Sequence, residues 1–219
     1  GIVTFRIGVL ISGRGSNLQA LIDACAQPDY PAEIALVISN EPEAKGLMRA
    51  QSAGLDTEII DHRSFVDRSA FEDALTSVLA GAGAELVCLA GFMRLLTNNF
   101  VERWHDRLIN VHPSLLPAFK GLDVHDRVIA TGTRFSGCTV HFIRPDMDSG
   151  PIIIQSAVPV LPHDRPEDLA ARVLASEHEC LSMAIRWIAE ERVQVVNDVV
   201  EIRGAVSPEG GLTNPSGAR

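Results

Sequence analysis

The chain has 219 residues, of which 46% are apolar and 21% charged, with a formal net charge of −9. This length suits one α/β domain whose core needs no disulfide or metal, and the acidic balance argues against a general nucleic-acid-binding protein. No apolar run approaches the roughly 20 residues of a membrane span, and no secretory signal opens the chain. We therefore expect a cytoplasmic protein without membrane contacts, whose four cysteines are reduced core thiols.

Strand and helix signals alternate through the first half of the chain. Short apolar runs predict strands at residues 6–12, 34–39, 57–60 and 85–90. Helical patterns begin at Asn17 and cover 42–53 and 68–82, with Gly54 in the position of a left-handed cap. This alternation predicts an α/β fold: a mostly parallel, twisted, Rossmann-like sheet with helices on both faces.

The second half is less regular. Strands are expected at 108–112, 137–143 and 152–160, with a weak helix near 124–130 and a long helix over 166–191. Pro159 places the last strand at or near a sheet edge. The final sixteen residues hold four glycines and two prolines without periodicity, so 204–219 is expected to be a flexible tail after a domain at 1–203.

A glycine-rich turn, Ser-Gly-Arg-Gly-Ser-Asn at 12–17, joins the first strand to the first helix. Glycines there let the backbone approach a ligand, and free N–H groups at a helix start face an anion. The dinucleotide fingerprint fails because Leu18 occupies the third glycine position, and no Gly-Lys-Ser/Thr follows for a nucleoside triphosphate. A monophosphate site or a plain tight turn remain the two interpretations.

Asn110 and His112 lie two apart on a predicted strand, so their side chains share one face at its carboxyl end. An amide and an imidazole on one spot can stabilise an oxyanion and move protons, although a strand histidine is often only a core residue. Asp148, on a turn between strands, is either solvated or the partner that orients His112 and favours its imidazolium.

No pair of histidines and no Cys/His cluster has metal-site spacing, which disfavours metal catalysis.

Glu177 interrupts an apolar stripe of the last predicted helix. At 100° per residue it falls among Leu169, Val173, Cys180 and Leu181. A carboxylate there is costly unless it meets a cation or hydrogen-bond donors. It is either one side of a buried salt bridge or a group that awaits a substrate ammonium or hydroxyl.

Five segments together resemble the folate-dependent glycinamide ribonucleotide formyltransferase family. They are ISGRGSNLQALID (11–23), LAGFMRLL (89–96), INVHPSLLPAFKG (109–121), TVHFIRPDMDSGPII (139–153) and SEH (176–178). The likeness covers residues about 6 to 190 and implies the Rossmann-like formyltransferase fold. One departure is Ser149, because the family usually has glycine after the catalytic aspartate.

The resemblance implies a role for each matching residue and a division into a phosphate-binding half at about 1–100 and a folate and catalytic half at about 101–203. It implies formyl transfer from 10-formyltetrahydrofolate, the co-substrate, to the primary amine of glycinamide ribonucleotide, with no metal; the partners are small molecules, and a homodimer stays open. The implied catalytic residues are Asn110, His112 and Asp148; the implied substrate site is Gly15, Ser16, Asn17 and Glu177; the implied folate site is Arg68, Met93, Arg94, Leu95, Leu96, Asn110, Arg144 and Asp148. The bond between Leu116 and Pro117 matches one that the family holds cis.

Two other functions stay open. A formyl-folate deformylase or a methionyl-tRNA formyltransferase would use the same His-Pro-Ser-Leu-Leu-Pro segment. Both families carry an additional domain, for which we expect this chain to have no room. A catalytically silent binding domain on the same scaffold is the alternative of a different class.

Overall fold

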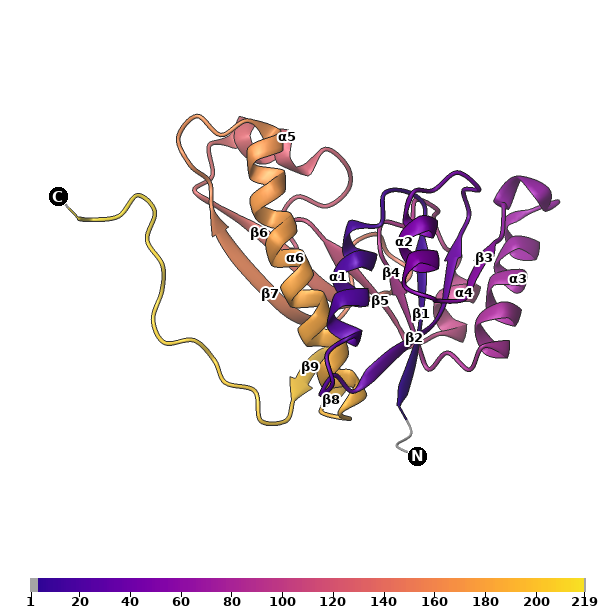
Figure 1. Cartoon of the computed structure of the whole chain (residues 1–219). Helices are drawn as coiled ribbons and strands as arrows, with labels where there is room; N and C mark the ends of the chain where they lie inside the picture. Colours follow the sequence, from indigo (N-terminus) through magenta and orange to yellow (C-terminus); the bar gives the residue numbers. More distant parts are fainter. Residues whose placement is uncertain (1–3, 219) are drawn as a thin grey trace.

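The computed structural model describes residues 4–218 and alternates strands with helices (Figure 1). In chain order the elements are β1 (Phe5–Ile11), α1 (Ser16–Cys25), β2 (Ala32–Ser39), α2 (Gly46–Ser52), β3 (Thr57–Ile59), a 3₁₀ turn (His62–Ser64), α3 (Arg68–Gly81), β4 (Leu86–Leu89), α4 (Asn98–Arg103), β5 (Leu108–His112), α5 (Val124–Thr131), β6 (Phe135–Phe142), β7 (Ile152–Pro159), α6 (Pro166–Ala189), β8 (Val193–Val196) and β9 (Val199–Ile202).

The central sheet has seven strands in the order β3-β2-β1-β4-β5-β6-β7. The first four pairings from the β3 side are parallel, and β6 and β7 add two antiparallel pairings. This confirms the predicted mostly parallel α/β sheet. β7 is an edge strand, as Pro159 predicted, because proline cannot donate to a further strand.

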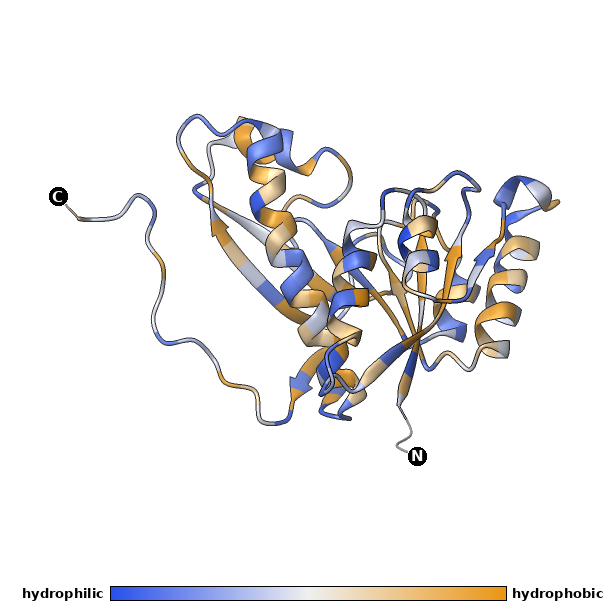
Figure 2. Ribbon diagram, viewed as in Figure 1, coloured by the Kyte–Doolittle hydropathy of each residue, from blue (hydrophilic) through white to orange (hydrophobic). Residues whose placement is uncertain are grey.

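Side chains of the parallel strands alternate between two apolar cores, one on each face of the sheet. Ile7, Val9 and Ile11 of β1 join the core covered by α1, α2 and α6, whereas Leu10 joins the core covered by α3 and α4. Figure 2 shows the result, with apolar colour concentrated in the central strands and mixed colour on the helices. Burial on both faces explains why these strands read as continuous apolar runs.

The predicted helix at 42–53 is wrong at its start, because α2 begins only at Gly46. The Gly46 N–H donates to the Gly13 carbonyl at 2.9 Å, and a Cβ at Gly46 would come within 3.2 Å of the Gly15 Cα. This position is therefore fixed by the glycine-rich turn rather than by helix propensity. Gly54 does adopt the expected left-handed conformation, with φ at 74°.

The short helix α4 and the hairpin of β8 and β9 were not predicted from the sequence. Asn197 and Asp198 form the hairpin turn with φ of 52° and 59°, and valines flank them on both sides. Both central residues with positive φ define a turn suited to a two-residue hairpin, and asparagine and aspartate tolerate that region. The Asn-Asp pair between valine runs was the signal available in the sequence.

Residues 204–218 contain no helix or strand and extend past the β7 side of the sheet (Figure 1). The Asn214 amide donates to the carbonyl oxygens of Arg134 at 2.7 Å and Val160 at 3.1 Å. The flexibility expected for the tail stays a prediction, and residues 1–3 and 219 of the expected domain and tail lie outside the described residues. Within 4–218, no helix combines the length and the apolar character needed to cross a bilayer.

Alanine substitutions at two glycines should change the stability of this packing in opposite directions. A Cβ at Gly137 in β6 would lie 1.9 Å from the Ser156 carbonyl oxygen, whereas a Cβ at Gly81 in α3 would meet nothing within 4 Å. We expect Gly137→Ala to lower the free energy of unfolding by roughly 2–3 kcal/mol through overpacking. Gly81→Ala should raise it by about 0.5 kcal/mol by restricting the unfolded chain. Urea unfolding measures both, and equal effects would contradict the packing described for β6 and β7.

Candidate active site

The order of the strands brings the predicted site residues close together. β1, β4 and β5 are parallel neighbours, so the glycine-rich turn after β1, the loop after β4 and His112 at the end of β5 lie along the same edge of the sheet. Open α/β sheets bind ligands at this edge. The topology therefore assembles residues that are far apart in the chain.

His112 is buried, with 6% of its surface exposed, and has a partner on each side of its ring. Its Nε2 lies 2.9 Å from the Phe119 carbonyl oxygen, which only accepts, so Nε2 carries a hydrogen. Its Nδ1 lies 3.6 Å from the Asp148 Oδ1. That separation suits an ion pair but is too long for a direct hydrogen bond, so the Nδ1 side of the ring is available to a ligand oxygen.

Asp148 reaches His112 from the turn between β6 and β7. Its other carboxylate oxygen accepts from the Gly121 N–H at 2.7 Å. The backbone of Asp148 has φ of 48°, and Gly150 has φ of 125° with no room for a Cβ beside the Phe142 carbonyl. Ser149, where the resembling family has glycine, is not left-handed and closes the turn by donating its hydroxyl to the Asp146 carbonyl at 2.7 Å.

Polar side chains of β6 and β7 hold the loop that follows β5, and this loop contacts both His112 and Asp148. The Thr139 hydroxyl donates to the Ser114 carbonyl at 2.7 Å and accepts from the Leu116 N–H at 3.1 Å, and the Gln155 amide donates to the Leu116 carbonyl at 2.9 Å. The bond between Leu116 and Pro117 is cis, as the resemblance implied. Thr139 and Gln155 were not predicted, because the residue pattern of a strand does not show which loop packs against that strand.

Asn110 lies on the same face of β5 as His112 and is half-buried. Across residues 4–218, its side chain has no hydrogen-bond partner, so the amide is free for a ligand. It pairs in register with His141 of β6, which is 2% exposed and whose pKa is lowered by burial. The His141 Nε2 also lacks a partner in this part of the chain. His141 was not predicted as a site residue, although a histidine in an apolar strand was an available signal.

The glycine-rich turn forms a second group of site residues. Gly15 precedes α1 with φ of 76°, the Ser16 hydroxyl lies 2.9 Å from the His178 Nε2, and the Asn17 amide donates to Glu177 at 3.4 Å. An open cavity of about 490 Å³ is lined by Ser16, Gln19, Ala20, Asp23, Arg49, Ala175, His178 and Glu179. Arg49 supplies a cation at this cavity and was not predicted, because it lies on α2, far from the motif in the sequence.

Glu177 occupies the buried position on α6 that its place in the apolar stripe predicted, with 8% of its surface exposed. Burial raises its pKa from 4.5 to about 7, and the long hydrogen bond from Asn17 opposes this only partly. The salt bridge that was the structural alternative is not formed with any residue of 4–218. A ligand donor beside Glu177 would therefore relieve an existing cost.

The residues expected to bind folate are more dispersed. Met93 and Leu95 are exposed on the loop after β4, and the Arg94 Nε is buried without a partner among the described residues. Arg68 is exposed at the start of α3. The Arg144 guanidinium is paired through Nη2 with Asp106 at 2.7 Å and with Asp198 at 3.4 Å. Between residues 4 and 218, no group of three or more His, Cys, Asp or Glu residues could hold a metal ion.

The chain is similar to known proteins in its family match, in its sequence and in its fold. A family model described as formyl transferase matches residues 5–185. A Haemophilus influenzae protein named phosphoribosylglycinamide formyltransferase is 38% identical over 209 residues, which are 95% of this chain and 99% of that protein. The trifunctional purine biosynthetic protein adenosine-3 of Bos taurus is 46% identical over 190 residues, 87% of this chain but only 19% of that protein. The crystal structure of glycinamide ribonucleotide transformylase 1 from Symbiobacterium toebii has a TM-score of 0.88 and 46% identity, with coverage of 91% of this chain and 94% of that one.

The raised pKa of Glu177 makes a prediction about stability against pH. Since the folded state holds this proton up to about pH 7 and the unfolded state releases it near 4.5, stability falls as pH rises through that window and is level above it. Glu177→Gln removes this loss. We expect the difference in unfolding free energy between variant and wild type to grow by on the order of 2–3 kcal/mol from pH 5 to pH 8.

Urea unfolding at both pH values measures this difference. The matched control is Glu179→Gln, which changes an exposed carboxylate two residues away on α6. It should follow the wild type at both pH values. Parallel pH profiles for wild type and Glu177→Gln would show that the carboxylate is not destabilised by burial.

Proposed function

Because the chain belongs to the formyl transferase family, we propose that it transfers the formyl group of 10-formyltetrahydrofolate to the primary amine of glycinamide ribonucleotide, a step of purine biosynthesis. The support for this substrate pair is the full-length similarity to the Haemophilus influenzae protein of that name, together with a site of suitable chemistry. The observation that carries the proposal is the approach of Asp148 to the buried His112, beside an Asn110 amide on the same strand face.

In the proposed complex, the substrate phosphate faces the N–H groups of Gly15, Ser16 and Asn17 at the start of α1, where the helix dipole favours an anion. Glu177 receives a hydroxyl or amine of the substrate, which supplies the donor that its buried carboxylate lacks. The formyl-folate lies along the loop at 93–96, with Arg68 and the turn from Arg144 to Asp148 as its further contacts. The two substrates then meet at the end of β5.

The reaction begins when the amine nitrogen attacks the formyl carbon and forms a carbon–nitrogen bond. The formyl oxygen becomes an oxyanion, which accepts hydrogen bonds from the Asn110 amide and from the Nδ1 side of His112. His112 can serve as the donor because the Phe119 carbonyl fixes its Nε2, leaving Nδ1 to face the reacting centre. Asp148 stabilises the imidazolium that this role requires.

Collapse of the tetrahedral intermediate returns the oxyanion electron pair to carbon and breaks its bond to folate N10. The attacking amine loses one proton and N10 gains one, so the transfer is balanced without another reactant. Asp148, which lies 3.6 Å from His112, is placed to help carry this proton, with a water completing the path. The products are the N-formylated glycinamide ribonucleotide and tetrahydrofolate.

We expect Asn110→Ala and Asp148→Asn each to lower kcat by about 10²–10³, since each removes charge stabilisation from the transition state. Folate binding, measured by fluorescence titration, should persist in both variants. The control is Asp123→Asn, a carboxylate-to-amide change at an exposed left-handed position two residues from Gly121. Near-normal turnover in Asn110→Ala and Asp148→Asn would refute these assignments.

The deformylase alternative differs in its nucleophile, which would be water. We expect wild-type protein to release tetrahydrofolate at least about 100-fold more slowly without glycinamide ribonucleotide than with it, because bound amine has the advantage of proximity. The absorbance change of formyl-folate turnover measures both rates. Equal rates would identify a deformylase, and no turnover with either nucleophile would identify a silent domain.

A further inference from the structure

The loop of residues 90–97 exposes apolar side chains that a folded chain would ordinarily bury. Met93 is 71% exposed and Leu95 is 70% exposed, although Phe92 and Leu96 on either side pack against the core under α3 and α4. Apolar packing therefore holds Phe92 and Leu96 and leaves Met93 and Leu95, which lie between them, facing outward. Something other than burial must fix the direction of those exposed side chains.

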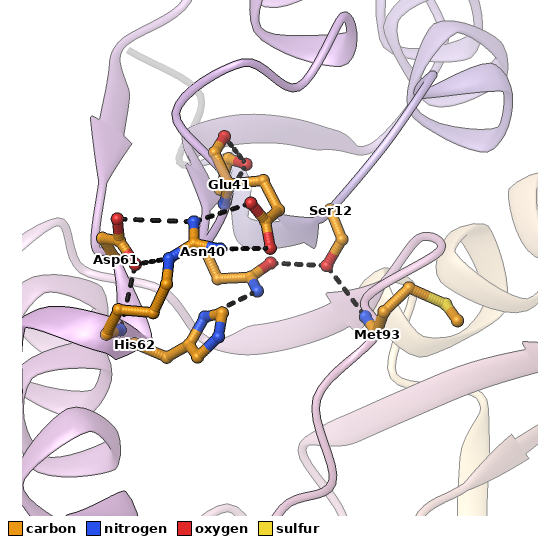
Figure 3. A network of polar contacts seen from close by, with 8 residues as sticks. Ser12, Asn40, Glu41, Asp61, His62 and Met93 are labelled. Carbon is orange, nitrogen blue, oxygen red and sulfur yellow. Dashed lines mark hydrogen bonds and ion pairs between the residues drawn. The ribbon is translucent and has the colours of Figure 1, made fainter.

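Ser12, the first residue after β1, makes a hydrogen bond that holds one end of this loop. Its hydroxyl oxygen accepts from the Met93 N–H at 2.8 Å, across 81 residues of sequence (Figure 3). The hydroxyl hydrogen is used by Asn40, whose Oδ1 accepts it and whose amide faces the His62 Nδ1 at 3.2 Å. Asn40 is 1% exposed, so it has little freedom to turn. Because Asn40 takes the hydrogen, a lone pair of Ser12 is directed at Met93.

Glu72 on α3 makes the second contact at the far end of the loop. Glu72 is 4% exposed, and its carboxylate accepts both from the Thr97 N–H at 2.7 Å and from the Thr97 hydroxyl. A buried carboxylate with two donors from one residue is a strong, directional attachment. Ser12 and Glu72 therefore attach the loop by its backbone at Met93 and Thr97, on either side of Leu95.

We propose that Ser12, oriented by Asn40, and Glu72 are positioning residues that hold the 90–97 loop in its ligand-ready conformation for the flat ring system of formyl-folate. This rests on the proposed function for the identity of the ligand. None of the three needs to touch the substrate. Their effect is on the fraction of molecules in which Met93 and Leu95 already present an apolar surface, and apparent affinity falls in proportion to that fraction.

The consequence is a separation of kinetic constants that general destabilisation does not produce. Loss of one contact lowers the population of the competent loop in the free protein, whereas saturating folate restores it. Ser12→Ala should therefore raise the KM for formyl-folate roughly five- to tenfold, the loss expected for one hydrogen bond, with kcat within about twofold of wild type. The KM for glycinamide ribonucleotide should not change.

Three further variants complete the experiment. Ser12→Thr keeps the hydroxyl and should restore the wild-type KM for formyl-folate. Glu72→Leu removes both acceptor oxygens that face Thr97 and should raise the same KM without changing kcat. Tyr30→Phe is the control, because it removes a hydrogen bond of similar length, 2.8 Å to the Ser182 carbonyl, away from the loop; it should lower stability and leave both KM values unchanged.

Amide hydrogen exchange gives a readout that does not depend on activity. Exchange at Met93 should be faster in Ser12→Ala than in wild type or Ser12→Thr, and a folate analogue should slow it again. An unchanged formyl-folate KM in Ser12→Ala would overturn the proposal, as would an equal rise in the KM for glycinamide ribonucleotide. If wild type fails to formylate the amine, the proposed function fails, and the exchange and analogue-binding measurements still decide the role of Ser12.

Discussion

The bond between the His112 Nε2 and the Phe119 carbonyl oxygen is the contact on which the rest of the site depends. A buried imidazole without partners is costly, and a carbonyl can only accept, so this bond fixes both the ring and its tautomer. It is possible only because the loop after β5 turns back over the strand that it leaves. Thr139 and Gln155 supply the donors and acceptors that this reversed backbone needs, and Gly121 of the same loop then meets Asp148. The loop after β5 thus makes contacts on both sides of the imidazole. Phe119 bonds the Nε2 side, and Gly121 holds Asp148 on the Nδ1 side.

Glu177 is the opposite case, because its buried carboxylate is short of hydrogen-bond donors. Burial away from sufficient hydrogen-bond donors raises the pKa of this carboxylate to about 7. Asn17 offers a single long hydrogen bond and keeps its own Oδ1 unpartnered among the described residues. Such a pair is poorly optimised for folding and well suited to a ligand that brings both donors and acceptors. Strain of this kind is expected at functional sites rather than in the scaffold.

The local residue pattern predicted the scaffold well, because strands that are buried on both faces of the sheet appear as continuous apolar runs in the sequence. It also predicted that Asn110 and His112 share a face and that Glu177 is buried, since both follow from the geometry of one element. It could not predict contacts that depend on where loops cross, such as Ser12 with Met93, Arg49 with the glycine-rich turn, or Thr139 with Leu116. The start of α2 was wrong for the same reason, because the Gly13 carbonyl and not the local sequence determines it. Asp148 was assigned to His112 by family resemblance, and no pattern in the sequence brings a turn residue to that strand.

Arg144 illustrates how a residue can serve a site from the far end of a strand. Its guanidinium is paired with Asp106 and Asp198, and the next residue back, Ile143, donates its N–H to the carbonyl of Leu108, the first residue of β5. The turn that carries Asp148 is therefore attached at the start of β5, while Asp148 itself approaches His112 at the end of that strand. Asp148 follows Arg144 by only four positions, so a displacement of this attachment point would also displace the carboxylate. The ion pairs of Arg144, one of them to the β8–β9 hairpin, thus tie the position of the carboxylate to an element outside the main sheet.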